Sequence, residues 1–89
     1  MALKIERRRS ADTLVVTLIG NLDVEHLSEV KAQVYGARCP VVVDIGELTL
    51  ISVEGIRFLN ACHDDGMLII NASGYIAEWM TLEGRSDRR

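Results

Sequence analysis

The sequence contains few of the residues that staple or interrupt a small fold. Its 89 residues include one proline, Pro40, and two cysteines, Cys39 and Cys62. One proline leaves little scope for a linker, and two thiols in an otherwise ordinary composition do not form a disulfide scaffold. We therefore predict a single domain at residues 1–84 in a reducing, cytoplasmic setting, followed by a polar and disordered tail at residues 85–89.

Long apolar runs and an excess of positive charge are also missing. No run reaches the roughly 18 residues that would cross a bilayer, and the chain begins with an alternating, charged segment rather than a signal peptide. The net charge is -3, which argues against a nucleic-acid binder because such proteins present a basic face. Arg7, Arg8 and Arg9 form one basic cluster between Glu6 and Asp12, which we interpret as a solvated strand end and turn.

Motifs of covalent or metal chemistry are likewise absent. The sequence has no glycine-rich phosphate loop and no serine nucleophile elbow. Residues 62–65 read Cys-His-Asp-Asp, but neighbouring residues at a helix end point in different directions, whereas metal ligands must converge. We interpret Cys39 as a packing residue and His26 as a surface residue, because neither has an evident partner. We predict no enzymatic activity, no metal site and no cofactor.

Hydrophobic periodicity predicts seven elements in the order β-β-α-β-α-β-α. Strands are expected at residues 3–8, 13–19, 41–45 and 67–70, with helices capped by Asp23, Ser52 and Ser73 and ending near Gly36, His63 and Gly84. A short turn joins the first two strands into an antiparallel hairpin with an edge strand. The later alternation of strands and helices implies parallel crossovers. The predicted fold class is α/β, a mixed sheet with helices packed on it.

Residues 41–45 read Val-Val-Val-Asp-Ile, without alternating polar residues among the valines. Such a strand is typical of parallel sheets that helices cover on both faces. We expect Val42 and Ile45 in the core and the strand in the centre of the sheet. Gly46 and Glu47 are expected to turn the chain toward the next helix.

The helix start that follows is the clearest local signal in the chain. Ser52 is predicted as its N-cap, because a serine hydroxyl accepts a bond from a main-chain N–H of the first turn. Glu54 lies where the positive end of the helix dipole favours a carboxylate. Gly55 costs about 1 kcal/mol relative to alanine, which indicates that something approaches the backbone there. The stretch is either a binding or regulatory site or a well-capped helix with no further role.

Four pieces of the chain together resemble STAS domains, the family of sulfate-transporter and anti-sigma-factor-antagonist domains. The family pattern has a hydrophobic strand ending in Asp-Leu and then Asp-Ser-Ser-Gly-Leu at a helix start. Residues 41–45 and residues 52–56, Ser-Val-Glu-Gly-Ile, match these two pieces, and residues 18–23 and 71–76 resemble the family's segments before and after them. The likeness spans residues 12–83 and implies a single-domain STAS-like fold.

The helix start departs from the family pattern. In regulatory STAS domains a partner kinase phosphorylates the second serine of the pattern, and the phosphate disrupts the complex. That serine is matched by Glu54, the serine before it by Val53 and the aspartate by Ser52. A phosphoserine carries about 1.5 to 2 negative charges, more than a glutamate. Glu54 is either a fixed imitation of the phosphorylated state or a helix-start carboxylate in a branch that never used the switch.

The resemblance implies a non-enzymatic protein-interaction module similar to an anti-sigma-factor antagonist. Its partner, such as an anti-sigma kinase, is expected to contact the helix start at Ser52, Val53, Glu54, Gly55 and Arg57. One alternative is a STAS-like accessory subunit of a membrane transporter, which binds an ATPase subunit and does not itself insert into the membrane. A second alternative is a small-ligand or nucleotide sensor that holds an anion near Gly55, although Glu54 would repel the anion.

The last predicted helix carries Ile76, Trp79 and Met80 close together on one side. Longer STAS domains continue with a further helix, so we expect part of this surface to remain uncovered. We predict that it is used in a homodimer or in a complex with a partner.

Overall fold

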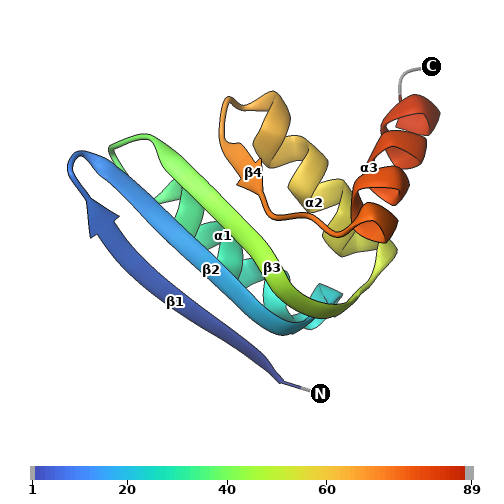
Figure 1. The fold of residues 1–89 in the computed structure, drawn as a ribbon, viewed down its shortest axis with the longest axis horizontal. Coiled ribbons are helices and arrows are strands. Elements are labelled where there is room, and N and C mark those ends of the chain that lie inside the picture. Colours follow the sequence, from blue (N-terminus) through green and yellow to red (C-terminus); the bar gives the residue numbers. More distant parts are fainter. Residues whose placement is uncertain (1, 88–89) are drawn as a thin grey trace.

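Four strands form one mixed sheet in the order β1-β2-β3-β4 (Figure 1). The computed structural model describes residues 2–87, and their side chains up to residue 84. The strands are β1 (Leu3–Ser10), β2 (Thr13–Leu22), β3 (Val41–Ile51) and β4 (Leu68–Ile70). The helices are the 3-10 helix η1 (Val24–His26) and the α-helices α1 (Leu27–Tyr35), α2 (Val53–Asp64) and α3 (Gly74–Asp87). The predicted element order is confirmed.

The pairing of the strands also follows the prediction. β1 and β2 form an antiparallel hairpin, while β3 lies parallel to both β2 and β4. β1 is therefore an edge strand and β3 is an interior strand. Helices α1 and α2 cover one face of the sheet, and α3 packs beside α2 (Figure 1). No helix within residues 2–87 has the length and apolar character needed to cross a membrane.

Only the sheet face under α1 and α2 is fully buried. On β3, Val41, Val43 and Ile45 are buried, while Val42, between the two valines, is only half-buried. The expectation for Ile45 is confirmed, but the expectation that Val42 lies in the core is wrong because helices cover one face of this sheet rather than both. Val42 lies on the open face instead, between its cross-strand neighbours Val15 and Leu68.

β3 is longer than predicted because it passes through a bulge. Gly46 and Glu47, predicted as a turn, lie inside the strand. The pairing shifts between Thr17↔Asp44 and Ile19↔Glu47, so β3 carries one more residue than β2 at this point. A glycine next to a polar residue is compatible with a turn or a bulge, and here the pairing with β2 continues to the start of α2.

The predicted cap at Asp23 is confirmed, and His26 completes a capping box at η1, the entry to α1, that was not predicted. Asp23 Oδ1 accepts a hydrogen bond from Val24 N at 2.7 Å, and Asp23 N donates one to His26 Nδ1 at 3.3 Å. His26 is therefore a half-buried structural residue, which corrects its interpretation as a surface residue. Gly36 follows the last residue of α1, as predicted.

Helix α3 begins where predicted but extends further. Ser73 Oγ accepts a hydrogen bond from Ile76 N at 3.2 Å, which confirms the predicted cap. The helix continues through Gly84 to Asp87, so the predicted stop at Gly84 is wrong. A glycine in a helix costs only about 1 kcal/mol, and Gly84 lacks the positive φ that ends a helix. Residues 88–89 of the predicted tail lie outside the described residues.

The apolar cluster of α3 divides between the core and the surface. Ile76 is buried with 3% of its surface exposed, and Trp79 and Met80 pack against the core while remaining partly exposed. Ile76 is therefore not available to a partner. The outer side of the cluster includes Tyr75, whose ring lies 5.7 Å from the ring of Trp79 between centroids.

Candidate partner-binding surface

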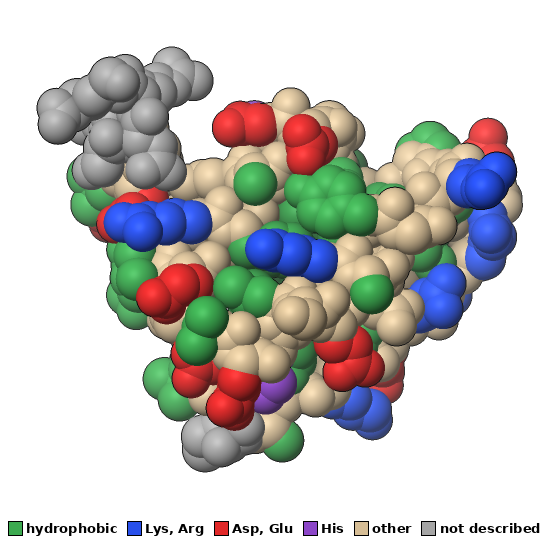
Figure 2. All heavy atoms as spheres, turned by 180° about the vertical axis from the view of Figure 1, so that it is seen from behind, with side chains coloured by type: hydrophobic (Ala, Val, Ile, Leu, Met, Phe, Trp, Pro, Cys, Tyr) green, Lys and Arg blue, Asp and Glu red, His purple; other side chains and the backbone are tan. Residues whose placement is uncertain are grey.

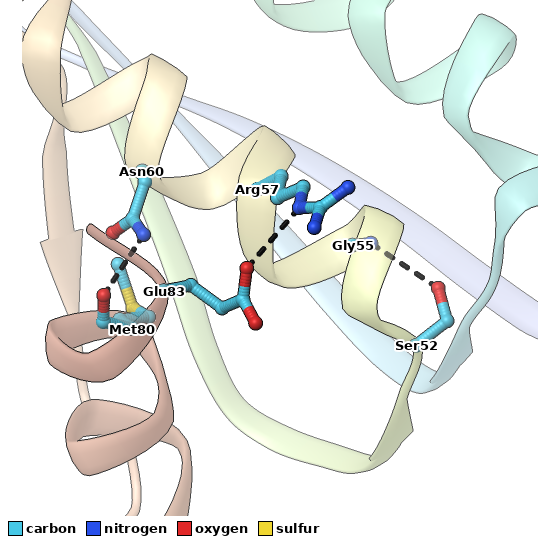
Figure 3. A network of polar contacts seen from close by, with 6 residues as sticks. All are labelled: Ser52, Gly55, Arg57, Asn60, Met80 and Glu83. Carbon is cyan, nitrogen blue, oxygen red and sulfur yellow. Dashed lines mark hydrogen bonds and ion pairs between the residues drawn. The ribbon is translucent and has the colours of Figure 1, made fainter. Parts of the chain in front are cut away.

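The start of α2 is fixed by hydrogen bonds within the chain. Ser52 has an extended backbone, and its Oγ accepts a hydrogen bond from Gly55 N at 3.1 Å (Figure 3). Ser52 N in turn donates to the carbonyl oxygen of Leu22, at the end of β2, at 3.0 Å. The predicted N-cap is confirmed. The cap also ties the start of the helix to a neighbouring strand, so this turn has a single, well-defined position.

Gly55 is needed because its own chain passes close to it. A Cβ on Gly55 would lie 2.8 Å from Ile51 Cγ1 and 3.1 Å from the carbonyl oxygen of Leu22. The close approach that the sequence predicts is therefore made by the end of β2 and the last residue of β3. Gly55 is buried, so it positions α2 and is not itself accessible to another molecule.

The charged residues of the helix start point outward but differ in their contacts. Arg57 Nε forms an ion pair with Glu83 Oε1 of α3 at 3.1 Å, with the arginine side chain 56% exposed (Figure 3). Glu54 is exposed and has neither an ion pair nor a side-chain hydrogen bond among the described residues. Val53 is half-buried. The carboxylate of Glu54 is thus the polar group at this helix start that remains available to another molecule.

A groove between α1 and α2 adjoins this helix start. It has a volume of about 500 Å³, and we call it the α1–α2 groove; its lining residues are Leu27, Lys31, Tyr35, Glu54, Arg57, Phe58 and Ala61. Leu27 and Phe58 are buried and form an apolar floor. Figure 2 views this side of the molecule and shows apolar side chains lying between cationic and anionic ones. The groove therefore offers apolar contact surrounded by charges of both signs.

The α1–α2 groove was not predicted from the sequence, although part of the signal is present there. Leu27, Lys31 and Tyr35 are spaced four residues apart and so share one stripe of α1. Glu54, Phe58 and Ala61 form a corresponding stripe on α2. Each stripe can be read from the sequence. The approach of the two helices that places the stripes side by side is a tertiary contact, and no local pattern reports it.

A contact between the last turn of α1 and the C-cap of α2 closes one end of the groove. Tyr35 OH donates a hydrogen bond to Asp65 Oδ2 at 2.7 Å. This hydrogen bond to a carboxylate, together with partial burial, holds the pKa of the Tyr35 phenol well above its ordinary value. The phenol therefore stays protonated at neutral pH and acts as a donor that joins the two helices.

The four potential metal ligands at residues 62–65 do not converge on one point. Cys62 is buried in the core, and burial raises the pKa of its thiol to about 11. Asp65 accepts the hydrogen bond from Tyr35. His63 and Asp64 are exposed, and His63 Nδ1 lies 3.8 Å from Asp64 Oδ1. Among the described side chains, no group of three His, Cys, Asp or Glu residues is placed to hold a metal ion.

Cys39 lines the same hollow as Asp65 and Gly66 at this helix end but makes a different contact. It is half-buried, and its Sγ accepts a hydrogen bond from Arg9 Nη1 at 3.4 Å. Cys39 and Cys62 are both free thiols. The partial burial of Cys39 agrees with a packing role at the entry to β3.

No protein-family model and no curated protein sequence matches the chain. Among solved structures, the anti-sigma factor antagonist SpoIIAA in its unphosphorylated form is similar, with a TM-score of 0.67 and 17% identity over 98% of this chain and 96% of that one. An uncharacterized protein of the DUF3478 family from Shewanella loihica PV-4, described as having a SpoIIAA-like fold, has a TM-score of 0.46 and 23% identity over 96% of this chain and 79% of that one. The likeness to SpoIIAA concerns the fold alone. This chain has the STAS-like α/β fold that its sequence implies.

Proposed function

We propose that the chain is a non-enzymatic protein-interaction module that binds a regulatory partner through the start of α2 and the α1–α2 groove. The observation that carries this proposal is the apolar floor of the groove beside the unpaired carboxylate of Glu54. Interfaces combine an apolar centre with a polar rim, and here Lys31, Glu54 and Arg57 supply the rim. The fold shared with an anti-sigma factor antagonist supports a role of the same kind in signal transduction and transcription regulation.

The chemistry of the helix start favours a protein partner over a small anion. An anion at the N-terminus of a helix binds to free main-chain N–H groups. One of these groups, Gly55 N, already donates to Ser52 Oγ. The carboxylate of Glu54 adds a negative charge to the same turn. The alternative of a nucleotide or anion sensor is therefore less well supported.

Ser52 and Glu54 give this surface a constant charge, so we do not expect it to act as a phosphoswitch. Glu54 has no hydroxyl group, and the hydroxyl of Ser52 is engaged in the cap. The proposed partner, a cytoplasmic protein, therefore recognises one permanent charge state. This feature favours, as a second candidate, the ATPase-like subunit of a transporter, which needs no phosphorylation, beside the anti-sigma kinase.

Quantitative affinity capture from the cells that naturally make the protein tests the proposal. Glu54→Lys and Ala61→Arg each change an exposed residue of the groove, whereas Glu78→Lys makes the same charge change at an exposed position of α3 outside it. We expect one set of proteins to be recovered by the wild type and by Glu78→Lys, and to be lost with both groove variants. Circular dichroism of each variant verifies the fold. Equal recovery with all four proteins contradicts the proposal.

A further inference from the structure

The outer edge of β1 has free main-chain hydrogen-bonding groups along its length. Asn21 N donates to the carbonyl oxygen of Ala2 at 3.2 Å, so residues 2 and 21 form a hydrogen-bonded pair. In an antiparallel hairpin, hydrogen-bonded pairs alternate with pairs that are not hydrogen-bonded. Residues 4, 6, 8 and 10 therefore direct their main-chain groups toward β2. The N–H and C=O groups of Leu3, Ile5, Arg7 and Arg9 point away from the sheet. An edge of this kind can accept a further strand.

The same edge carries a row of cationic side chains. Lys4, Arg7, Arg8 and Arg9 all belong to β1 and are exposed. Lys4 pairs with Glu6 at 3.2 Å. Within the part of the chain that the structure describes, Arg7 and Arg8 have no ion pair and Arg9 has no carboxylate partner. Figure 2 shows Lys and Arg side chains along the right-hand margin of the molecule, where β1 lies when viewed from behind.

We propose that the edge of β1 binds an extended, acidic peptide segment of a partner protein, which pairs with β1 as a fifth strand. The main-chain groups provide the pairing and the three arginines select the charge of the incoming strand. Opposite charges on directly facing residues stabilise a strand pair, and like charges destabilise it. This surface is separate from the α1–α2 groove, and the inference does not depend on the function proposed for the groove.

Charge also decides against two other occupants of this edge. A second copy of the chain would place the arginines of one β1 opposite those of the other, and such repulsion is how edge strands avoid pairing with themselves. A nucleic acid would meet the cations, but its phosphates only accept hydrogen bonds, whereas this edge alternates donors and acceptors. The net charge of -3 further disfavours binding to a polyanion.

The arrangement of the arginines predicts the pattern of the acidic segment. Successive side chains of a strand point to opposite faces of the sheet. Arg7 and Arg9 therefore lie on one face and Arg8 on the other, in the register that pairs them with Val16, Leu14 and Val15. An incoming strand needs three consecutive acidic residues to reach all three. A strand with acidic residues at alternate positions would reach the arginines of one face only.

A titration of the isotope-labelled full chain with a synthetic peptide, Thr-Val-Glu-Glu-Glu-Val-Thr with blocked ends, tests the proposal by nuclear magnetic resonance. We expect the largest shifts at the amides of β1, led by Arg7 and Arg9, and a lower affinity at high salt. Arg7→Gln and Arg8→Gln should each weaken binding about three- to five-fold. The control Ala32→Glu makes the same change of net charge at an exposed position of α1, and it should leave the affinity unchanged.

A second peptide separates strand pairing from simple charge attraction. Methylation of alternate main-chain nitrogens keeps the three glutamates and removes the donors of one edge, and it should weaken binding about ten-fold or more. Equal binding of the methylated peptide, or largest shifts at the start of α2, contradicts the inference. It is also overturned if a single-stranded oligonucleotide binds β1 as tightly as the peptide, or if the β1 amides shift with the concentration of the chain alone.

Discussion

The two ends of α2 are held in different ways. At its start, Ser52 and Gly55 contact the main chain of Leu22 in β2, through a hydrogen bond and through close packing. At its end, side chains make the contacts: Cys62 is buried in the core and Asp65 accepts a bond from Tyr35 of α1. Both ends are anchored, so the exposed surface between them is formed before any partner arrives. A preformed surface binds without the cost of ordering it.

The largest effect is expected from crowding the start of the helix. Gly55→Val adds atoms where even a Cβ would lie 2.8 Å from Ile51 Cγ1, and we expect it to lower the free energy of unfolding by about 3 kcal/mol. Gly84→Ala is the control, because its Cβ would lie 3.8 Å from Asn60 Nδ2, an ordinary van der Waals distance. The free energy of unfolding of Gly84→Ala should rise by up to about 1 kcal/mol, because alanine has the higher helix propensity. Urea unfolding measures the stability of both variants, and a neutral Gly55→Val would show that the contacts with Ile51 and Leu22 are loose.

The end of the helix should weaken at alkaline pH. Burial raises the pKa of Cys62 from 9.0 to about 11, so the unfolded chain loses its thiol proton at a lower pH than the folded chain. The contribution of this thiol to the free energy of unfolding is fully present below pH 9 and is lost as the pH rises toward 11. Between pH 8 and 10 we expect a loss of about 1 kcal/mol. Unfolding curves at both pH values measure it. The slope should become clearly smaller in Cys62→Ala, where the raised pKa of Tyr35 leaves a lesser part of it; an unchanged slope in that variant contradicts the assignment.

Removal of the cap should have a similar but pH-independent effect. Ser52→Ala deletes the oxygen that accepts the bond from Gly55 N and should cost about 1 kcal/mol. The matched control is Ser28→Ala, at an exposed position inside α1, which should be neutral or slightly stabilising because alanine favours a helix. Thermal unfolding of the two variants provides the comparison. Equal melting temperatures would mean that the cap adds nothing to the contacts with β2.

The smallest effect should come from the side-chain bond at the end of the helix. Tyr35→Phe removes the bond to Asp65, but Tyr35 is 47% exposed, so water replaces much of it and we expect a loss of about 0.5 kcal/mol. Tyr75→Phe is the control, since Tyr75 is 65% exposed and contacts Trp79 through its ring. It should leave the melting temperature unchanged. If Tyr35→Phe lowered the free energy of unfolding more than Ser52→Ala, the bond at the end of α2 would be stronger than the cap at its start, contrary to this prediction.

The comparison also explains which parts of the site could be predicted from the sequence. The cap of Ser52 was predictable because its donor lies three residues away on the same turn. The need for Gly55 was predictable, but one of the two residues that crowd it, Leu22, belongs to β2, far from Gly55 in the sequence. The α1–α2 groove requires the packing of two helices, which neither helix encodes alone.

The fold shows the same division between local and distant information. Element order and the hairpin follow from periodicity and turns, and the prediction of both is confirmed. Val42 was placed in the core wrongly because a run of valines does not reveal how many faces of a sheet are covered. His26 was missed because the capping box usually ends in Glu or Gln, whereas here an imidazole nitrogen accepts the bond.

Site-specific photo-crosslinking in the cells that naturally produce the protein tests the central claim most directly. A photoreactive amino acid replaces Ala61, an exposed residue of the α1–α2 groove, or Leu68, which is 58% exposed on the open face of the sheet. We expect a covalent adduct with a distinct protein from position 61 and none from position 68. Adducts from position 68, with none from position 61, would place the partner on the opposite face and contradict the account.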